Sequence, residues 1–243
     1  MPESARYRKV LLKVSGESLA QSGALGIDAD ALNLLAHEII AATETGTAIA
    51  VVIGGGNIIR GATLSKAGLI PQASADYMGM LGTIINGIAL KETLDNLGQP
   101  ARLLSALNIT SVAEPFIRGR ALRHMEKGRV IILGGGTGNP FCTTDTAAAL
   151  RATELNCDII LKATKVDGVY TSDPNTDPKA KRYERLTFDE AIAAQLRIMD
   201  LTALSMCMEQ RLPIVVFDFK VRGNIKAVVE GRPIGTMITC GEK

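Results

Sequence analysis

Residues 48–61 read Ala-Ile-Ala-Val-Val-Ile-Gly-Gly-Gly-Asn-Ile-Ile-Arg-Gly, and this stretch decides the fold class. Its first part is an unbroken apolar run, which predicts a strand buried on both faces, as in a parallel sheet covered by helices. The glycines that follow predict a tight turn at the carboxyl end of that strand. Ligands of α/β sheets bind at this end, where backbone N–H groups can reach an anion.

Short apolar runs followed by helical patterns recur along the whole chain. This alternation is typical of a three-layer α/β/α fold with a central, mainly parallel sheet. Further strands are expected at residues 9–14, 101–104, 130–133, 159–162, 214–217 and 236–239. Helices are expected from Asp28 or Asp30 to about Glu44, from Thr143 or Thr144 to about Glu154, and at residues 76–97, 189–195, 202–210 and 223–229. Residues 172–185 carry turn signals and are expected to form a loop.

The composition limits the possible functions. A chain of 243 residues with no clear linker predicts a single domain over residues 1–243. A net charge of +2, from 27 basic and 25 acidic residues, argues against a nucleic-acid partner. No apolar run is long enough to cross a bilayer, and residues 1–9 are polar, so we expect no membrane partner and a cytoplasmic location. The four cysteines lie far apart, which predicts free thiols rather than a metal site.

The helix expected at residues 76–97 contains three glycines, Gly79, Gly82 and Gly87. Each glycine inside a helix costs about 1 kcal/mol relative to alanine, so three of them indicate the close approach of another backbone. That backbone can belong to the same chain or to a second subunit, and the sequence leaves both interpretations open.

Three glycine-bearing turns follow expected strands, at residues 13–18, 54–61 and 134–140. All three should open on one crevice, because the carboxyl ends of parallel strands lie at the same edge of the sheet. The P-loop pattern GxxxxGK[ST] does not occur, and the Rossmann pattern GxGxxG fails because Ile59 and Phe141 stand at its last position. The turns therefore indicate a different kind of anion site, with tight strand–helix corners as the plain alternative.

Three charged residues accompany these turns. Lys13 ends the first strand, where its ammonium group could neutralise a transferring phosphoryl group. Arg60 offers a planar fork for bidentate phosphate binding. Asp145 falls in the first turn of a helix, where the helix dipole favours a carboxylate. The structural alternatives are, in the same order, a solvated strand end, a surface salt bridge and helix capping.

The motif Lys13-Val14-Ser15-Gly16, the turn at residues 53–61 and the stretch at residues 165–174 together resemble the amino acid kinase family. Residues 136–145, Gly-Thr-Gly-Asn-Pro-Phe-Cys-Thr-Thr-Asp, are similar to the UMP kinase branch of that family, as are residues 76–80 and 199–203. The resemblance covers residues 9–239. It implies an enzyme that transfers the γ-phosphate of ATP to UMP in pyrimidine nucleotide biosynthesis.

The resemblance also implies three groups of site residues. Those expected in catalysis are Lys13, Arg60 and Asp145, with Asp145 orienting the lysine or organising Mg²⁺-bound phosphates. Those expected to bind ATP are Lys13, Val14, Ser15, Gly16, Gly56, Arg60, Thr164, Tyr170 and Asp173. Those expected to bind UMP are Gly55, Asp76, Thr137, Gly138, Asn139, Pro140, Phe141, Cys142, Thr143 and Thr144. Lys162 and Lys165 are phosphate candidates of lower rank.

Expectations about partners follow from the same resemblance. Mg²⁺ should arrive with ATP, so the protein is expected to have no metal site of its own. A homohexamer is expected, with GTP and UTP as candidate effectors. Residues up to about 150 should bind the acceptor and residues 151–243 should bind ATP, with Lys13, Gly56 and Arg60 reaching the ATP phosphates.

Two other functions remain open on the sequence alone. A sister kinase of the family would phosphorylate a carboxylate or a carbamate, which needs no pocket for ribose or uracil. A non-catalytic nucleotide-binding or storage protein can have the same fold, although the presence of both Lys13 and Asp145 argues against it.

Overall fold

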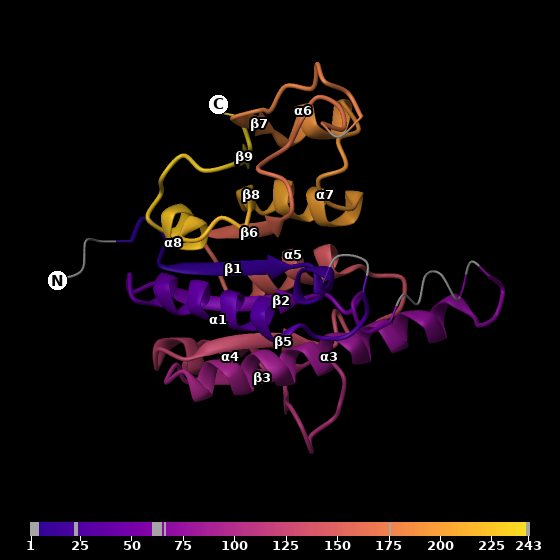
Figure 1. The fold of residues 1–243 in the computed structure, drawn as a ribbon, viewed down its shortest axis with the longest axis vertical. Helices are drawn as coiled ribbons and strands as arrows, with labels where there is room; N and C mark the ends of the chain where they lie inside the picture. Colours follow the sequence, from indigo (N-terminus) through magenta and orange to yellow (C-terminus); the bar gives the residue numbers. More distant parts are fainter. Residues whose placement is uncertain (1–4, 22–23, 60–64, 66, 175, 242–243) are drawn as a thin grey trace.

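A computed structural model describes residues 5–21, 24–59, 65, 67–174 and 176–241. Within this part of the chain, nine strands form one sheet in the order β4-β3-β5-β2-β1-β6-β8-β9-β7 (Figure 1). The strands are β1 (Lys9–Val14), β2 (Ala48–Ile53), β3 (Ala101–Ser105), β4 (Glu114–Pro115), β5 (Val130–Gly134), β6 (Ile159–Thr164), β7 (Arg185–Thr187), β8 (Ile214–Asp218) and β9 (Thr236–Thr239). All neighbouring strands pair in parallel except β8 and β9. The expected mainly parallel sheet is confirmed.

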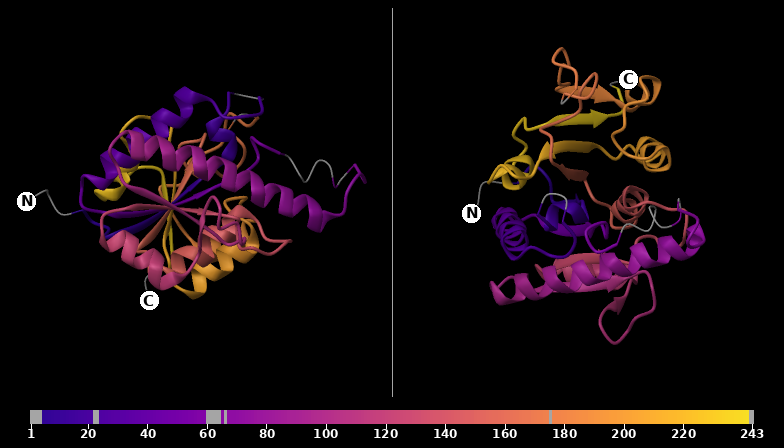
Figure 2. Two further views of the ribbon diagram at one scale, coloured as in Figure 1. Left: turned by 90° about the horizontal axis from the view of Figure 1, so that it is seen from below. Right: turned by 45° about the vertical axis from the view of Figure 1, so that its right-hand side comes forward.

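Helices cover both faces of this sheet (Figures 1 and 2). One face packs against α1 (Ala29–Thr43), α3 (Gln72–Asn96) and α8 (Asn224–Val229). The other packs against α4 (Arg118–Glu126), α5 (Thr144–Glu154), α6 (Phe188–Ala193) and α7 (Leu201–Glu209). A short 3₁₀ helix, η1 (Gly16–Leu19), follows β1. None of the helices in the described residues combines the length and apolar character that a membrane span requires.

Strand β1 shows how the two layers place the functional side chains. Successive side chains of a strand point to opposite faces of the sheet. Val10, Leu12 and Val14 belong to the apolar core on the α1 side, whereas Leu11 belongs to the core on the α5 side. The alternation therefore places Lys13 on the α5 side, at the carboxyl end of the strand.

The structure selects one capping residue where the sequence offered two. Asp28 caps α1 and accepts a hydrogen bond of 2.9 Å from the backbone N–H of Ala31. Thr143 caps α5 and accepts hydrogen bonds from two backbone N–H groups. Both caps satisfy donors that the first turn of a helix leaves unpaired.

Two strands and one α-helix were not predicted, namely β4, β7 and α4. Two of them are very short edge strands, and β4 ends in a proline, so neither carries a usable apolar pattern. Helix α4 is strongly polar and buries only Ala121 and Met125, which left too few apolar positions to show a helical period. Strand β7 begins at Arg185, where the expected loop ends.

The glycines of α3 pack largely within the chain. A Cβ atom at Gly82 would lie 3.1 Å from the carbonyl oxygen of Gly55, and one at Gly87 would lie 2.6 Å from Leu103 Cδ1. A Cβ at Gly79 would meet no atom of the described residues within 4 Å. Packing inside one subunit therefore explains Gly82 and Gly87 and leaves Gly79 without such a reason.

Candidate active site

Two lysines and an aspartate form a charged centre near the carboxyl ends of β1 and β6. Lys13 and Lys162 are register partners on these parallel strands, so their side chains leave the same face of the sheet. Asp145, in the first turn of α5, lies between them. Its Oδ1 is 2.8 Å from Lys13 Nζ, and its Oδ2 accepts a hydrogen bond of 2.7 Å from Lys162 Nζ. Two ammonium groups and one carboxylate leave one positive charge available to an anionic ligand.

The charged centre is largely shielded from solvent. The side chains of Lys13, Asp145 and Lys162 are 13%, 16% and 12% exposed. Burial works to raise the pKa of Asp145, but the two ammonium groups outweigh it and hold this pKa below its ordinary value. Burial lowers the pKa of Lys162, although the charge of Asp145 opposes that shift. Asp145 is therefore ionised at neutral pH and acts as a counter-charge to the two ammonium groups.

The start of α5 fixes the position of Asp145. Thr143 Oγ1 accepts hydrogen bonds from the backbone N–H groups of Asp145 and Thr146, at 3.0 and 3.2 Å. The hydroxyl of Thr146 in turn accepts from the backbone N–H of Thr143, which completes a capping box. Because Thr143 supplies the cap, the carboxylate of Asp145 is not used for capping and is directed to the lysines.

The first two glycine turns pack directly against each other and against α3. A Cβ at Gly16 would lie 2.5 Å from the carbonyl oxygen of Gly54, and one at Gly55 would lie 2.5 Å from that of Gly79. These contacts require glycine at both positions for packing, as expected if the turns are tight strand–helix corners. Gly56 differs, because a Cβ there would meet only Glu17 Cγ, at 3.8 Å. Its backbone is therefore the part of this turn that remains accessible to a ligand.

A buried pair of amides anchors the second turn to α3. Asn57 and Asn86 are 1% and 0% exposed, and their side chains exchange hydrogen bonds of 3.0 and 2.7 Å. Asn86 also donates to the carbonyl oxygen of Gly54, at 2.7 Å. Buried polar groups of this kind are costly unless each is paired, so the network fixes the turn in one position.

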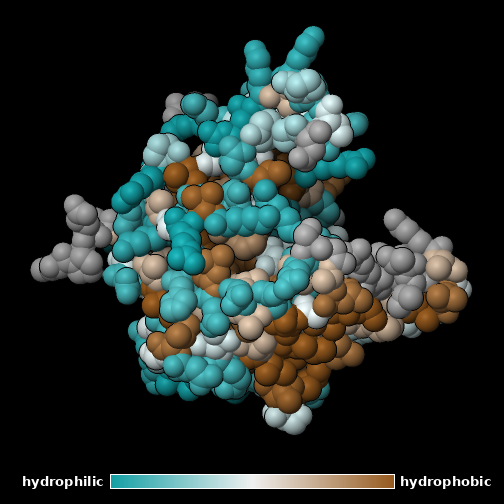
Figure 3. Space-filling view, viewed as in Figure 1, coloured by the Kyte–Doolittle hydropathy of each residue, from teal (hydrophilic) through white to brown (hydrophobic). Residues whose placement is uncertain are grey.

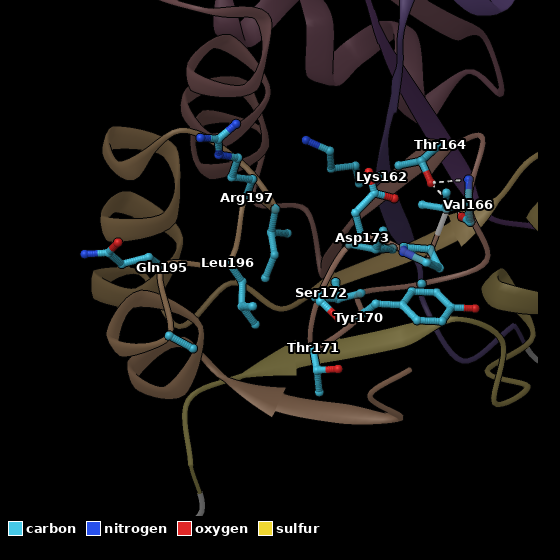
Figure 4. Close-up of a pocket in the computed structure, with 16 residues that line it drawn as sticks. Lys162, Thr164, Val166, Tyr170, Thr171, Ser172, Asp173, Gln195, Leu196 and Arg197 are labelled. Atoms are coloured by element: carbon cyan, nitrogen blue, oxygen red, sulfur yellow. Dashed lines mark hydrogen bonds between the residues drawn. The ribbon is translucent and has the colours of Figure 1, made fainter. Parts of the chain in front are cut away.

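A cavity of about 520 Å³, called the large cavity below, opens beside β6 (Figure 4). Thr164, Tyr170 and Asp173, all expected at the ATP site, line it together with Lys162. Its other wall is the segment at residues 194–198, between α6 and α7. Figure 4 shows the two walls facing each other across the space. The cavity therefore brings together the three residues beyond residue 150 that the resemblance assigned to ATP binding.

A second cavity of about 240 Å³, called the small cavity, lies between α3, the second glycine turn and the start of α5. Its lining includes five residues expected to bind UMP, which are Gly55, Asp76, Cys142, Thr143 and Thr144. Gly56, expected at the ATP phosphates, lines it as well. Thr144 directly precedes Asp145, and Lys162 lines the large cavity, so the charged centre stands between the two cavities.

The other residues expected to bind UMP, Thr137, Gly138, Asn139, Pro140 and Phe141, do not line the small cavity. The side chain of Phe141 is 77% exposed, and its φ of 66° lies in the left-handed region. Its backbone N–H donates to Asp76 Oδ2 at 2.8 Å. Asp76 Oδ1 accepts from the side-chain amide of Gln72 at 2.7 Å. Asp76 thus ties this loop to α3 in the structure, besides lining the cavity.

Val14 and Arg60 are two further residues expected to bind ATP. Val14 is 0% exposed and packs in the core on the α1 side, so its side chain does not reach the crevice. Its carbonyl oxygen accepts the backbone N–H of Gly54, which makes its role structural. Arg60 lies outside the described residues, and its expected role stays a prediction.

Several residues at the cavities were not found from the sequence. Met80 and Thr83 line the small cavity, and Thr83 Oγ1 accepts the backbone N–H of Gly135 at 2.8 Å. The spacing of Asp76, Met80 and Thr83 places them on one face of a helix and could have indicated them. The segment at residues 194–198 gives no comparable signal, because it is irregular and far from the glycine turns in the sequence.

Comparison with known proteins identifies the family. The model of the "Amino acid kinase family" matches residues 8–218. The chain belongs to the amino acid kinase family. Among solved structures, the chain is similar to UMP kinase from Bacillus anthracis, with 38% identity, a TM-score of 0.94 and 97% of each chain covered.

Two further solved structures resemble this chain. UMP kinase from Ureaplasma parvum is 36% identical, with a TM-score of 0.90, over 96% of this chain and 99% of that one. Uridylate kinase from Archaeoglobus fulgidus is 26% identical, with a TM-score of 0.73, over 95% and 99%. The similarity therefore spans both cavities and the charged centre.

Proposed function

We propose that this member of the amino acid kinase family is a phosphotransferase that moves the γ-phosphate of ATP onto UMP, giving UDP and ADP in pyrimidine nucleotide biosynthesis. The observation that carries the proposal is the Lys13–Asp145–Lys162 centre, which stands between two cavities. The similarity to UMP kinases over nearly the whole chain supports UMP as the acceptor.

The proposed reaction needs positioning and charge more than acid–base chemistry. A phosphate oxygen of UMP attacks the γ-phosphorus of ATP, and the bond from that phosphorus to the ADP oxygen breaks. The acceptor needs no general base, because the second pKa of a phosphomonoester is about 6. Lys13 and Lys162 stabilise the negative charge on the transferring group, and Asp145 holds both ammonium groups in place before the substrates bind.

Each cavity receives one nucleotide in this proposal. ATP occupies the large cavity, where Thr164, Tyr170 and Asp173 lie beside its nucleoside. UMP occupies the small cavity, supported by the side chains from the starts of α3 and α5. The backbone of residues 13–16 and 54–56 meets the phosphates between them. Residues up to about 150 thus form the acceptor part, and residues 151–243 form the ATP part.

Mg²⁺ completes the proposed site as a companion of ATP. No group of three or more acidic, histidine or cysteine residues suited to a metal ion occurs in the described residues. The carboxylate of Asp145 is engaged by two lysines. This arrangement fits a cation held mainly by phosphate oxygens and water, as Mg²⁺ commonly is. When bound, Mg²⁺ neutralises charge on the β- and γ-phosphates.

The acceptor is tested by comparing UMP, CMP, acetylglutamate and carbamate as substrates with Mg²⁺ and ATP. We expect ADP release above background with UMP and none with the carboxylate or the carbamate, because the small cavity is lined by polar side chains such as Asp76, Thr143 and Thr144, which a ribose or a base can use. ADP release is followed by a coupled assay at equal enzyme concentration. Turnover of a carboxylate or carbamate without turnover of UMP would contradict the proposal, and binding of UMP without any turnover would point to a storage protein.

We further propose that the enzyme is a homohexamer in which α3 contributes a subunit contact. Tyr77, Leu81 and Ile85 repeat at intervals of one helical turn and are 44%, 45% and 46% exposed. Figure 3 shows an apolar area over α3 and below it. Val112 and Ile117, which follow β3 in the chain, are also exposed. Contiguous apolar surface of this kind marks protein interfaces.

The resemblance to the UMP kinase branch also indicates GTP and UTP as the effectors to test on this assembly. The proposed location of the enzyme is the cytoplasm, where free thiols stay reduced.

The Leu81→Asp/Ile85→Asp double variant is expected to lower the assembly state, because each new carboxylate would be buried without a partner. Native mass spectrometry and light scattering should give a hexamer for the parent and a smaller species for the variant. Val221→Asp, a similar change at a residue 54% exposed in the other half of the chain, should leave the mass unchanged. A parent that is monomeric at micromolar concentration would contradict the proposal.

A further inference from the structure

The stretch at residues 199–203 takes no part in the mechanism described so far, yet it contains a carboxylate that bridges two helices. Asp200 precedes α7, and its Oδ1 accepts the backbone N–H of Ala203 at 2.9 Å, which caps that helix. Its Oδ2 accepts a hydrogen bond of 3.0 Å from Thr146 Oγ1 and another from Thr143 Oγ1. One oxygen therefore caps α7, and the other accepts hydrogen bonds from two threonines at the start of α5.

The second oxygen acts on the charged centre through Thr143. The hydroxyl of Thr143 donates to Asp200, which directs its lone pairs toward the backbone N–H groups of Asp145 and Thr146. Asp145 in turn holds the two lysines. A continuous chain of contacts thus runs from α7 through the cap of α5 to the groups that meet the transferring phosphate.

Asp200 also contributes charge near this centre. Burial lowers the pKa of Lys162, and the negative charge of Asp200 is among the influences that oppose this shift. The same chain of contacts reaches the small cavity, because Thr143 lines it. Asp200 therefore lies behind both the charged centre and the acceptor site while lining neither of the two cavities.

We infer that Asp200 is a positioning residue for phosphoryl transfer: it locks the start of α5 to α7 and so holds Asp145 and the acceptor loop in register with the two lysines. The inference rests on the proposed function and adds to it a dependence of the acceptor site on α7, which belongs to the ATP part of the chain. Displacements of about 1 Å in such a site can cost on the order of 10²-fold in rate.

The variant Asp200→Ser separates the two roles of this side chain. Serine keeps an oxygen suited to capping α7, but it is too short to reach Thr143 and Thr146. We expect kcat to fall about 10- to 100-fold and the Kd of UMP to rise several-fold, while the Kd of ATP changes less than about twofold. Asp28→Ser is the matched control, because Asp28 caps α1 in the same way and lines neither cavity, and it should leave all three constants unchanged.

A second readout does not depend on turnover. In Asp200→Ser the backbone N–H groups of Asp145 and Thr146 should exchange with solvent at least about tenfold faster, because the hydroxyl that accepts them is no longer held. In Asp28→Ser they should not change. A double variant, Asp200→Ser with Thr146→Val, gives a third readout. Its fold-loss of kcat should be smaller than the product of the two single fold-losses, because both changes remove the same contact.

The outcomes distinguish the inference from the proposed function. If the parent enzyme does not form UDP, the proposed function fails, and the exchange rates alone decide the role of Asp200. If the parent is active and Asp200→Ser loses stability while keeping kcat, the Kd of UMP and the exchange rates, then Asp200 is a helix cap only and the inference is overturned.

Discussion

The Lys13→Ala variant is expected to lose turnover of UMP by about 10³-fold or more, while UMP still binds with nearly its parent affinity. Lys13 supplies one of two ammonium groups at the point where charge develops on the transferring phosphate. Its loss also leaves Asp145 with a single cation, so the remaining charge of the centre falls from positive to neutral. The small cavity does not include Lys13 in its lining, and binding of UMP should therefore survive.

The two parts of this prediction need separate measurements. A coupled assay gives kcat, and isothermal titration gives the Kd of UMP. Lys127→Ala, at the exposed end of α4, is the matched control and should keep both values. Turnover within tenfold of the parent in Lys13→Ala would mean that the phosphoryl group is stabilised elsewhere, and it would contradict the site described above.

The Asp145→Asn variant is expected to lower kcat by about 10²- to 10⁴-fold with little change in fold, because asparagine has the same shape but no charge. Lys13 and Lys162 would then repel each other across a buried space. The charge of Asp145 opposes the downward shift that burial imposes on the pKa of Lys162. Its removal should therefore lower the pKa of Lys162 further, so the alkaline loss of that ammonium group would begin at a lower pH than in the parent.

This second effect can be read directly by NMR titration of the Lys162 Cε signal, assigned with Lys162→Arg. The parent signal should titrate below the ordinary value of 10.5, and the Asp145→Asn signal should titrate lower still. Asp189→Asn, at an exposed position in the first turn of α6, serves as the control for loss of a helix-terminal charge. A Lys162 pKa that rises in Asp145→Asn would show that the aspartate does not act as its counter-charge.

Much of the fold could be predicted because its strands are buried on both faces. The central strands β1, β2, β5, β6 and β8 each contain a run of at least three consecutive apolar residues, a signal that depends only on the local sequence. The edge strands β4 and β7 are defined by their partners rather than by composition, so local patterns do not indicate them. Helix α4 was not predicted for a related reason, since it packs against the sheet through only two buried residues.

The site was predictable where a residue's place follows from its own element. Lys13 lies next to the last residue of β1 and Asp145 lies in the first turn of α5, and both positions can be read from local patterns. Lys162 was ranked low because its pairing with Lys13 depends on the register of two strands far apart in the chain. Asp200 bonds to Thr143 across 57 residues, and no periodicity connects them. Contacts between elements therefore decide the parts of the site that the sequence did not indicate.

The most direct test of the central claim follows the phosphoryl group itself. The enzyme is incubated with Mg²⁺, UMP and ATP that carries ³²P in its γ-phosphate, and the products are separated by chromatography. We expect the label to enter the β-phosphate of UDP in equal amount to the ADP formed, and we expect Lys13→Ala and Asp145→Asn to slow this transfer by the factors given above. Label released as inorganic phosphate, or recovered entirely in ATP while UMP stays bound, would contradict this expectation.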